Sequence, residues 1–345
     1  MAEVCLGLVV LGVTAYAVFG GADFGAGFWD LTAGGDRRGG RIRGLVQRSM
    51  SPVWEANHVW LIFVLVIAWT AFPVAFGAIF ANLAVPLFLA ALGIIARGTA
   101  FALRGQAATM AEARTLGAVF AVASVLVPFF FGTVLGGIAS GRVEVENADA
   151  GADAWLNATS LTVGVLAVMS GAFVAAVFLG GDALRGGLLD LERAFRKRAL
   201  GAGVVTGAAT LGGLLVVRSD ARPLFDGLTS GAGLAAAAAS ALAGGATLAL
   251  VWGRRWAAAR GTAALAVAAV IVGWVLASEP DLLPGRLTID DAAAPDATLT
   301  ALAASVGVGF LILGPSLWYL YRLVLQGRLD QEFEPLDQRF RPLDK

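Results

Sequence analysis

The chain has 345 residues, of which 58% are hydrophobic and 14% are charged, and its mean hydropathy is +0.78. Because soluble domains carry about 25% charged residues, this composition predicts an all-α polytopic membrane protein. The formal net charge of zero gives no support to a nucleic-acid partner, and a single cysteine, Cys5, excludes disulfides within the chain.

The chain also has a single histidine, His58. A haem held by two histidines of this chain alone is therefore excluded, as is a metal site built from several histidines. The sequence contains no nucleotide-binding loop, nucleophile triad or zinc motif. The N-terminus lacks a basic region and an obvious cleavage site, so we expect its first apolar run to be retained as a helix.

Apolar runs long enough to cross a membrane recur along the whole chain, since a span needs about 20 mostly apolar residues. The sequence predicts nine of them, at about 4–29, 55–79, 80–104, 115–139, 157–181, 199–218, 229–253, 260–278 and 299–322. The second and third are nearly continuous, so we expect a tight hairpin around Ala81 and Asn82. The expected architecture is one integral membrane domain over 1–345, with two four-helix bundles, one extra helix and a tail at 323–345.

The basic residues alternate between the predicted loops. The loops after the first, third, fifth and seventh spans and the C-terminal tail hold 20 of the 25 lysines and arginines. The loops after the other spans are poor in basic residues, and two of them are rich in acids. Basic loops stay in the cytoplasm, so the pattern predicts a protein of the bacterial cytoplasmic membrane with its N-terminus outside and its C-terminus inside.

A faint internal repeat links the two halves of the chain. The first span contains the sequence AVFGGAD at 17–23, and the fifth contains AVFLGGD at 176–182. A duplicated four-helix unit, covering about 1–140 and 155–280 and followed by the last helix at 299–322, would give this offset. Chance in a chain rich in alanine and glycine would give it equally well.

The segment Trp54–Leu61, with the sequence WEANHVWL, opens the second span. Glu55 and His58 are three residues apart and share a helical face, and Trp54 lies one turn before His58. The apolar run that follows, to Phe80, has no charge. A carboxylate and an imidazole at the mouth of a span are candidates for a functional site, because ionisable groups inside a membrane are costly.

Topology places the few ionisable residues of the spans at a common depth. Asp23 lies near the inner end of the first span, Glu55 and His58 open the second, and Arg97 lies two turns from the inner end of the third. We therefore expect these four residues to be neighbours in the cytoplasmic third of the membrane. Asp30, at a helix end, is expected to be solvated.

Two interpretations of this group remain open at this point. One is a proton path from the cytoplasm, in which Asp23, Glu55 and His58 exchange and relay protons. The other is a buried ion-pair lock that pins three helices together. The tryptophans of the segment are expected to be interfacial anchors or packing residues.

The sequence resembles subunit II of cytochrome bd-type quinol oxidases. The resemblance rests on DFGAG at 23–27, WEANHVWL at 54–61, WTAFP at 69–73 and ARG at 96–98. It covers the whole chain by topology and is specific over about 16–104. Residue by residue, Asp23 matches the acid of the first-helix motif and Glu55 the acid after the tryptophan. Trp54, Asn57 and Trp60 match directly.

The resemblance implies a subunit of a terminal respiratory oxidase that oxidises quinol and reduces dioxygen to water. It implies an obligate heterodimer with a haem-bearing subunit I, which holds haems b and d. No cofactor is expected on this chain alone, apart from a structural quinone that some members hold. Membrane lipid, quinone and small single-helix subunits are further implied partners. We expect this chain to stabilise subunit I and to feed protons through Asp23, Glu55 and His58, with Arg97, Trp54, Asn57 and Trp60 in ion-pair or structural roles.

The chain departs from the family pattern at two positions, and two rival functions remain. Gly20 stands where the family often has a second acid, and His58 stands where other polar residues are usual. A proton-coupled secondary transporter could use the same charges, although such proteins place broken helices in both halves. A purely structural membrane scaffold is the third possibility.

Overall fold

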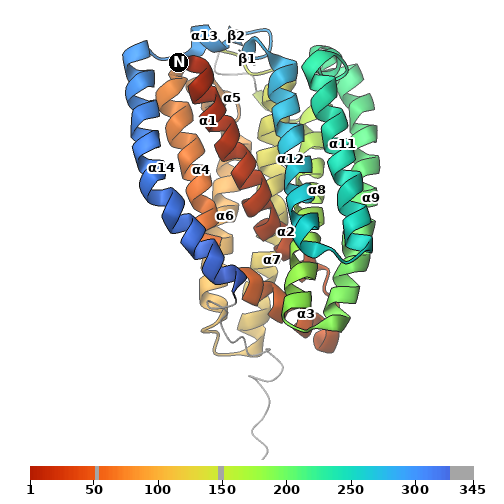
Figure 1. Ribbon diagram of the computed structural model, residues 1–345. Helices are drawn as coiled ribbons and strands as arrows, with labels where there is room; N and C mark the ends of the chain where they lie inside the picture. The colour runs from red at the N-terminus through yellow and green to blue at the C-terminus, as the bar shows by residue number, and fades with distance from the viewer. Residues whose placement is uncertain (51–53, 147–150, 327–345) are drawn as a thin grey trace, which may run out of the picture.

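The computed structural model describes residues 1–50, 54–146 and 151–326. In these ranges, nine helices are long and apolar enough to cross a membrane, which confirms the predicted all-α polytopic fold. The helices run side by side in a bundle, with the N-terminus at one end and the end of the last helix at the other (Figure 1). Of the predicted tail at 323–345, residues 327–345 lie outside the described residues.

The first span is a continuous helical rod, Ala2–Leu31, built from α1 (Ala2–Ala15), the π-helical turn η1 (Tyr16–Gly20) and α2 (Gly21–Leu31). The other eight spanning helices are α4 (Trp54–Ala71), α6 (Ala84–Arg104), α7 (Met110–Ala139), α8 (Ala158–Arg185), α9 (Leu189–Asp220), α11 (Gly231–Trp252), α12 (Trp256–Ser278) and α14 (Asp296–Leu325). All nine lie within a few residues of the predicted spans, except at the second span and at the start of the sixth.

Short elements connect the spans. They are α3 (Asp36–Met50), α5 (Pro73–Asn82), η2 (Gly151–Ala154), α10 (Arg222–Leu228), α13 (Ile289–Ala292) and an antiparallel hairpin of β1 (Asp281–Leu283) and β2 (Leu287–Thr288). Helix α3 is amphipathic and buries Ile42, Leu45, Val46 and Met50, which follow the helical period, against the bundle.

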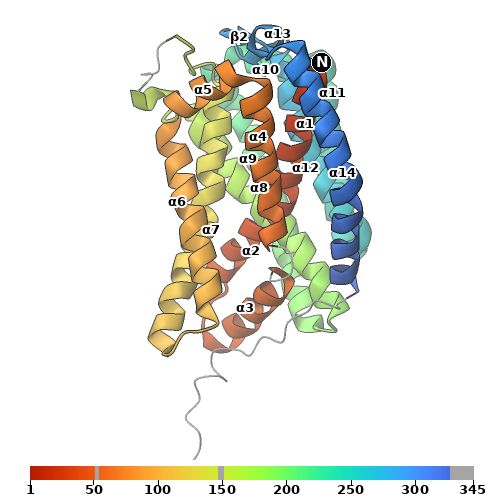
Figure 2. The ribbon, with the colours of Figure 1, turned by 90° about the vertical axis from the view of Figure 1, so that its left-hand side faces the viewer.

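The tight hairpin expected around Ala81 and Asn82 is wrong. Helix α4 ends at Ala71, because Phe72 leaves the helical conformation with φ −133° and ψ 59°, and Pro73 then begins α5. The chain therefore reverses through a short helix that lies across the end of the bundle (Figure 2). The second span is shorter than expected for this reason.

Small residues allow the central helices to approach closely. A methyl group at Gly25 of α2 would lie 2.0 Å from the carbonyl oxygen of Gly171 in α8. A methyl group at Gly132 of α7 would lie 2.6 Å from the Cα atom of Gly164 in α8. Glycine is thus required at these crossings, and helix packing accounts for it.

The two ends of the bundle differ in charge. The connections α2–α3, α6–α7, α8–α9 and α11–α12 lie at the end opposite the N-terminus (Figure 1). We call this end the arginine-rich end, since these connections, helix α3 and the adjoining ends of the spanning helices hold most of the basic residues. The β-hairpin and α13 cover the other end. The predicted internal repeat is not tested by this arrangement and stays a prediction.

Candidate functional site

The centre of the candidate site is an ion pair between Asp23 of α2 and Arg97 of α6. The Oδ1 atom of Asp23 accepts a hydrogen bond from Nη2 of Arg97 at 2.9 Å, and each side chain is only 2% exposed. Ionic groups this deep need a partner, since an isolated buried charge is strongly destabilising. The structure thus confirms that two of the four expected neighbours are in contact.

The Arg97 guanidinium is held by two aromatic rings and a serine in addition to Asp23. Its carbon lies 4.7 Å from the ring centroid of Phe24 and 4.9 Å from that of Phe120, so it stacks between two aromatic faces. Its Nε donates to the Oγ of Ser124 in α7 at 2.9 Å. The Ser124 hydroxyl in turn donates to the Phe120 carbonyl, which orients its oxygen as an acceptor. One side chain therefore joins α2, α6 and α7.

A π-helical turn, Tyr16–Gly20, lies directly before this pair, and such turns often mark functional sites. The side-chain amide of Asn57 in α4 donates to the Phe19 carbonyl of this turn at 3.3 Å. Three polar atoms here are buried without a hydrogen-bond partner among the described residues: Asp23 Oδ2, Tyr16 Oη and Asn57 Oδ1. Because buried polar groups are normally hydrogen-bonded, this cluster is suited to hold water.

His58 lies next to the same turn. Its Nδ1 donates to the carbonyl oxygen of Trp54, one turn earlier in α4, at 2.8 Å, so Nε2 is the nitrogen left for other contacts. The imidazole packs edge-on against the rings of Tyr16, Phe24 and Trp54, with centroids 6.2 to 6.3 Å away. His58 thus shares Phe24 with Arg97, and the expected proximity to the ion pair is found through that ring.

The two tryptophans of the segment pack α4 on different neighbours. Trp54 lies against Phe101 of α6, with ring centroids 5.3 Å apart. Trp60 lies against Phe310 of α14, with centroids 6.5 Å apart, and its buried Nε1 has no hydrogen-bond partner among the described residues. The structural role predicted for both residues fits these contacts.

Glu55 does not join the cluster, and the expectation of four mutual neighbours is wrong for it. Its side chain is exposed and makes no hydrogen bond or ion pair to a described residue. The reason is helical geometry. Glu55 and His58 lie on the same side of α4, but Glu55 lies at the outer edge of that side and is exposed. Figure 2 shows that α4 begins well short of the α6–α7 connection. Glu55, in the first turn of α4, is therefore exposed on the side of the bundle, at a depth between its two ends.

Asp30 was expected to be solvated, and this is wrong, because it is 3% exposed. Its two carboxylate oxygens accept from Arg43 of α3 and Arg104 of α6, each at 2.9 Å. Asp30 follows Asp23 by seven residues, and Arg104 follows Arg97 by seven residues. Two Asp–Arg pairs are therefore stacked along the same α2–α6 contact, and this equal spacing is the signal that sequence reasoning missed.

Charges held inside the bundle also occur in the second half of the chain, which contributes none of the four expected neighbours. Glu192 of α9 is 0% exposed and accepts from Arg254 at 3.0 Å and from the indole nitrogen of Trp256 at 3.3 Å. Asp182 of α8 pairs with Arg260 of α12 and with Arg185. Asp182 ends the segment AVFLGGD as Asp23 ends AVFGGAD, but its interhelical arginine lies on α12, whereas that of Asp23 lies on α6.

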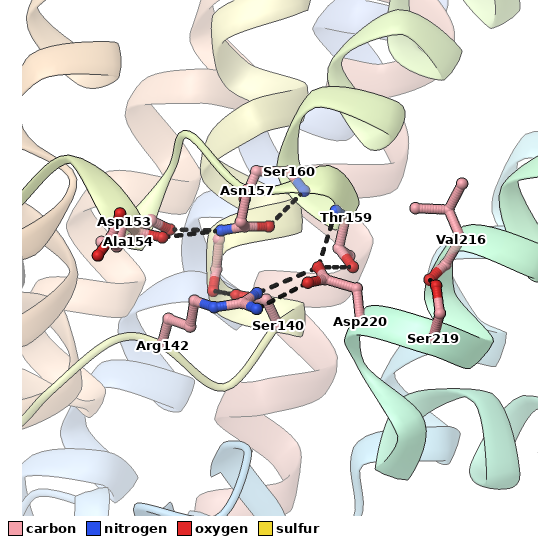
Figure 3. A network of polar contacts seen from close by, with 11 residues as sticks. Ser140, Arg142, Asp153, Ala154, Asn157, Thr159, Ser160, Val216, Ser219 and Asp220 are labelled. Atoms are coloured by element: carbon pink, nitrogen blue, oxygen red, sulfur yellow. Dashed lines mark hydrogen bonds and ion pairs between the residues drawn. The ribbon is translucent and has the colours of Figure 1, made fainter.

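A further polar network lies at the opposite end (Figure 3). The Asp220 carboxylate at the end of α9 accepts two hydrogen bonds from Arg142, at 2.7 and 3.1 Å. It also accepts from the backbone nitrogen and hydroxyl of Thr159 in the first turn of α8, at 3.0 and 2.6 Å. The hydrogen bonds that Arg142 donates to the Asp220 carboxylate raise the pKa of Arg142, so this guanidinium stays charged. The network ties α8, α9 and the α7–α8 connection together.

The described residues contain no group of three or more histidine, cysteine, aspartate or glutamate side chains placed to hold a metal ion. The only imidazole is hydrogen-bonded to its own helix and packed on aromatic rings. The described residues of this region offer an ion pair, an imidazole and several buried polar atoms without a described partner.

The chain is similar to known proteins along almost its whole length. The profile of the family described as cytochrome bd terminal oxidase subunit II matches residues 1–324. A Bacillus subtilis (strain 168) protein named as a cytochrome bd menaquinol oxidase subunit II is 23% identical over 328 residues, covering 92% of this chain and 93% of the relative. The solved structure of bd oxidase from Geobacillus thermodenitrificans matches with a TM-score of 0.78 and 25% identity, over 94% of this chain and 98% of the matched chain.

Proposed function

Since the chain belongs to the family of cytochrome bd terminal oxidase subunit II, we propose that it is the haem-free subunit of a terminal respiratory oxidase that oxidises quinol and reduces dioxygen to water. Its relatives are subunits of a cytochrome bd oxidase, an oxidoreductase complex. The name of the Bacillus relative specifies menaquinol, and we propose a quinol as the electron donor here without choosing among quinols. The rival proposal of a proton-coupled transporter has no comparable support.

The partner in this proposal is a haem-bearing subunit I, bound as an obligate heterodimer. Haems b and d belong to that subunit, and we assign none to His58, whose Nδ1 and ring are engaged within its own chain. The exposed position of Glu55 supports a partner, because a carboxylate facing lipid at a level inside the bundle is costly. We infer that the first turn of α4 faces subunit I.

The second part of the proposal is a proton path that begins at Glu55. At the contact with subunit I, Glu55 takes up a proton that water brings from the arginine-rich end, which we place in the cytoplasm because basic loops remain there. His58, one turn further along α4, accepts the proton at Nε2 while Nδ1 stays bonded to Trp54. Water at the unpartnered oxygen of Asp23 then carries it further. Arg97 holds Asp23 in place and does not itself transfer protons.

One observation carries this path. Three buried polar atoms, Asp23 Oδ2, Tyr16 Oη and Asn57 Oδ1, have no hydrogen-bond partner among the described residues and surround a π-helical turn. Each buried polar atom without a hydrogen-bond partner costs about 1–3 kcal/mol. Water bridging these atoms removes that cost and supplies a proton relay.

Purification tests the assignment to the oxidase. The tagged chain, extracted in mild detergent, should bring down a larger subunit, and the preparation should show haem absorption bands. It should consume oxygen when a quinol is added. A colourless single chain that catalyses solute transport would overturn the proposal.

A further inference from the structure

The π-helical turn Tyr16–Gly20 separates two parts of the first span, α1 and α2. Its characteristic hydrogen bond runs from the backbone nitrogen of Gly21 to the carbonyl oxygen of Tyr16, five residues earlier. The turn therefore holds one residue more than a turn of α-helix. Each residue rotates an α-helix by about 100°, so this extra residue changes which side chains of α1 and α2 share a face.

Close contacts fix the face that each part presents. In α1, a methyl group at Gly12 would lie 2.8 Å from the ring of Phe63, so α1 is seated on α4. In α2, a methyl group at Gly27 would lie 2.2 Å from the side chain of Ser124 in α7, and Gly25 is equally close to α8. Neither part can rotate without overlap at these glycines. The π-helical turn takes up the difference in rotation between them.

Tyr16 and Asp23 face different helices as a result. Seven residues make nearly two full turns of an unbroken α-helix, which would place both side chains on one face. Instead, the ring of Tyr16 lies edge-on to His58 of α4 and Phe131 of α7. The carboxylate of Asp23 bonds to Arg97 of α6. The π-helical turn therefore sets the direction in which Asp23 points.

Asn57 is the side chain of α4 that bonds to this turn. It is 2% exposed, and its side-chain nitrogen donates to the Phe19 carbonyl within the turn at 3.3 Å. Because π-helical turns are rare inside α-helices, we expect contacts from outside to stabilise the one found here. Asn57 directly precedes His58, so the same part of α4 holds both the turn and the imidazole.

We propose that Asn57 is a positioning residue, whose amide stabilises the π-helical turn and thereby keeps Asp23 directed at Arg97. The amide itself neither gains nor loses a proton, because it has no ionisable group. The consequence for activity rests on the proposed proton path, which uses the second carboxylate oxygen of Asp23. The turn sets the direction of that oxygen together with the rest of the side chain.

Hydrogen–deuterium exchange of the intact complex, read from peptides that cover residues 16–23, tests this role. Asn57→Leu keeps the size of the side chain and removes the donor, so exchange in this segment should accelerate about fivefold, the factor that corresponds to one hydrogen bond. The matched control is Asn82→Leu, because the buried Asn82 of α5 also donates to backbone carbonyls, those of Ala78 and Glu144. An unchanged rate in Asn57→Leu, or an equal acceleration in the control, would overturn the proposal.

Deletion of Ala17 provides a second test that does not depend on the folding of Asn57→Leu alone. Without one of its five residues, the turn becomes α-helical while α1 and α2 keep their faces, so it no longer needs the contact with Asn57. Asn57→Leu should then cause no further acceleration of exchange. If Asn57→Leu alone fails to assemble, the variant that combines it with the deletion should assemble. Failure of this combined variant to assemble, or a full fivefold acceleration in it, would overturn the proposal.

Oxygen consumption with a quinol separates this inference from the proposed function. The Asn57→Leu complex should keep its haem spectrum and its KM for quinol. Its turnover should fall about fivefold and show a larger solvent deuterium isotope effect, because proton delivery then limits the rate. Loss of haem in step with the loss of turnover would show a merely structural contact and overturn the positioning role. Faster exchange with unchanged turnover would support the contact between Asn57 and the turn but contradict the proton path through Asp23.

Discussion

Two acidic positions near the arginine-rich end use the same chemical group in opposite ways. The carboxylate of Asp23 is 2% exposed and is held by Arg97, which is itself stacked between two rings. The carboxylate of Glu55 is exposed and unpaired among the described residues. Burial with a fixed partner makes a charge part of the architecture, whereas exposure leaves it able to exchange protons. The two positions should therefore respond differently to substitution.

The largest effect is expected for Arg97→Met, which removes the partner of a fully buried carboxylate. Breaking such a pair costs about 3–5 kcal/mol, because the remaining charge has no compensation. The melting temperature of the purified complex should fall sharply, and haem should be lost together with the subunit contact. Thermal unfolding in detergent, followed by the haem absorption, measures this.

A double variant separates the pair from the packing of its neighbours. In Arg97→Met/Asp23→Leu both charges are replaced by apolar groups, and much of the lost stability should return. If the double variant is as unstable as the two single losses added together, the pair does not act as a lock.

An intermediate effect is expected for Asp30→Asn. Asparagine retains one oxygen as an acceptor but removes the charge that faces Arg43 and Arg104. Hydrogen bonds to charged groups contribute about 1.5–3 kcal/mol, so the free energy of unfolding should fall by that amount. A change below about 0.5 kcal/mol would show that Asp30 behaves as a solvated residue after all.

A smaller effect is expected at the opposite end for Asp220→Asn. This variant weakens the contacts to Arg142 and Thr159 that tie α9 to α8, with an expected loss of about 1–2 kcal/mol. The matched control is Asp226→Asn, because Asp226 forms an exposed i,i+4 pair with Arg222. Exposed pairs of this kind contribute about 0.3–0.5 kcal/mol. Equal shifts in melting temperature for both variants would contradict the ranking.

The spans could be predicted from the sequence because hydropathy and the charge of the loops are properties of short, continuous stretches of sequence. The same rules placed Asp23, His58 and Arg97 at one depth, and the structure brings the first and third into contact. The reversal at Phe72 could not be located, since apolar residues continue through it from α4 into α6. Only the position of Pro73 gave a local signal for the break.

The rest of the site depends on contacts between helices, which a single sequence does not reveal. Asp30 appeared solvated because it stands at a helix end, but α3 folds back and carries Arg43 onto it. Glu192 stands among basic residues in the sequence, yet it is buried under Trp256. The π-helical turn at Tyr16–Gly20 has no proline or other obvious mark, so the cluster of unpartnered polar atoms around it was not foreseen.

The smallest effect on stability and the decisive effect on activity are expected for Glu55→Gln. Removal of an exposed charge that pairs with no described residue should change the free energy of unfolding by less than about 0.5 kcal/mol. The control is Glu3→Gln, because Glu3 is also an exposed acid in the first turn of a spanning helix, but at the opposite end. Both variants should purify with the full haem spectrum.

The central claim is tested most directly by the oxygen consumption of these two complexes with a quinol, normalised to haem content. The Glu55→Gln complex should consume oxygen at about one tenth of the wild-type rate or below, because proton delivery is impaired. The Glu3→Gln complex should match the wild type. Full activity in Glu55→Gln, or a loss of activity that only follows a loss of haem, would contradict a proton path that begins at Glu55.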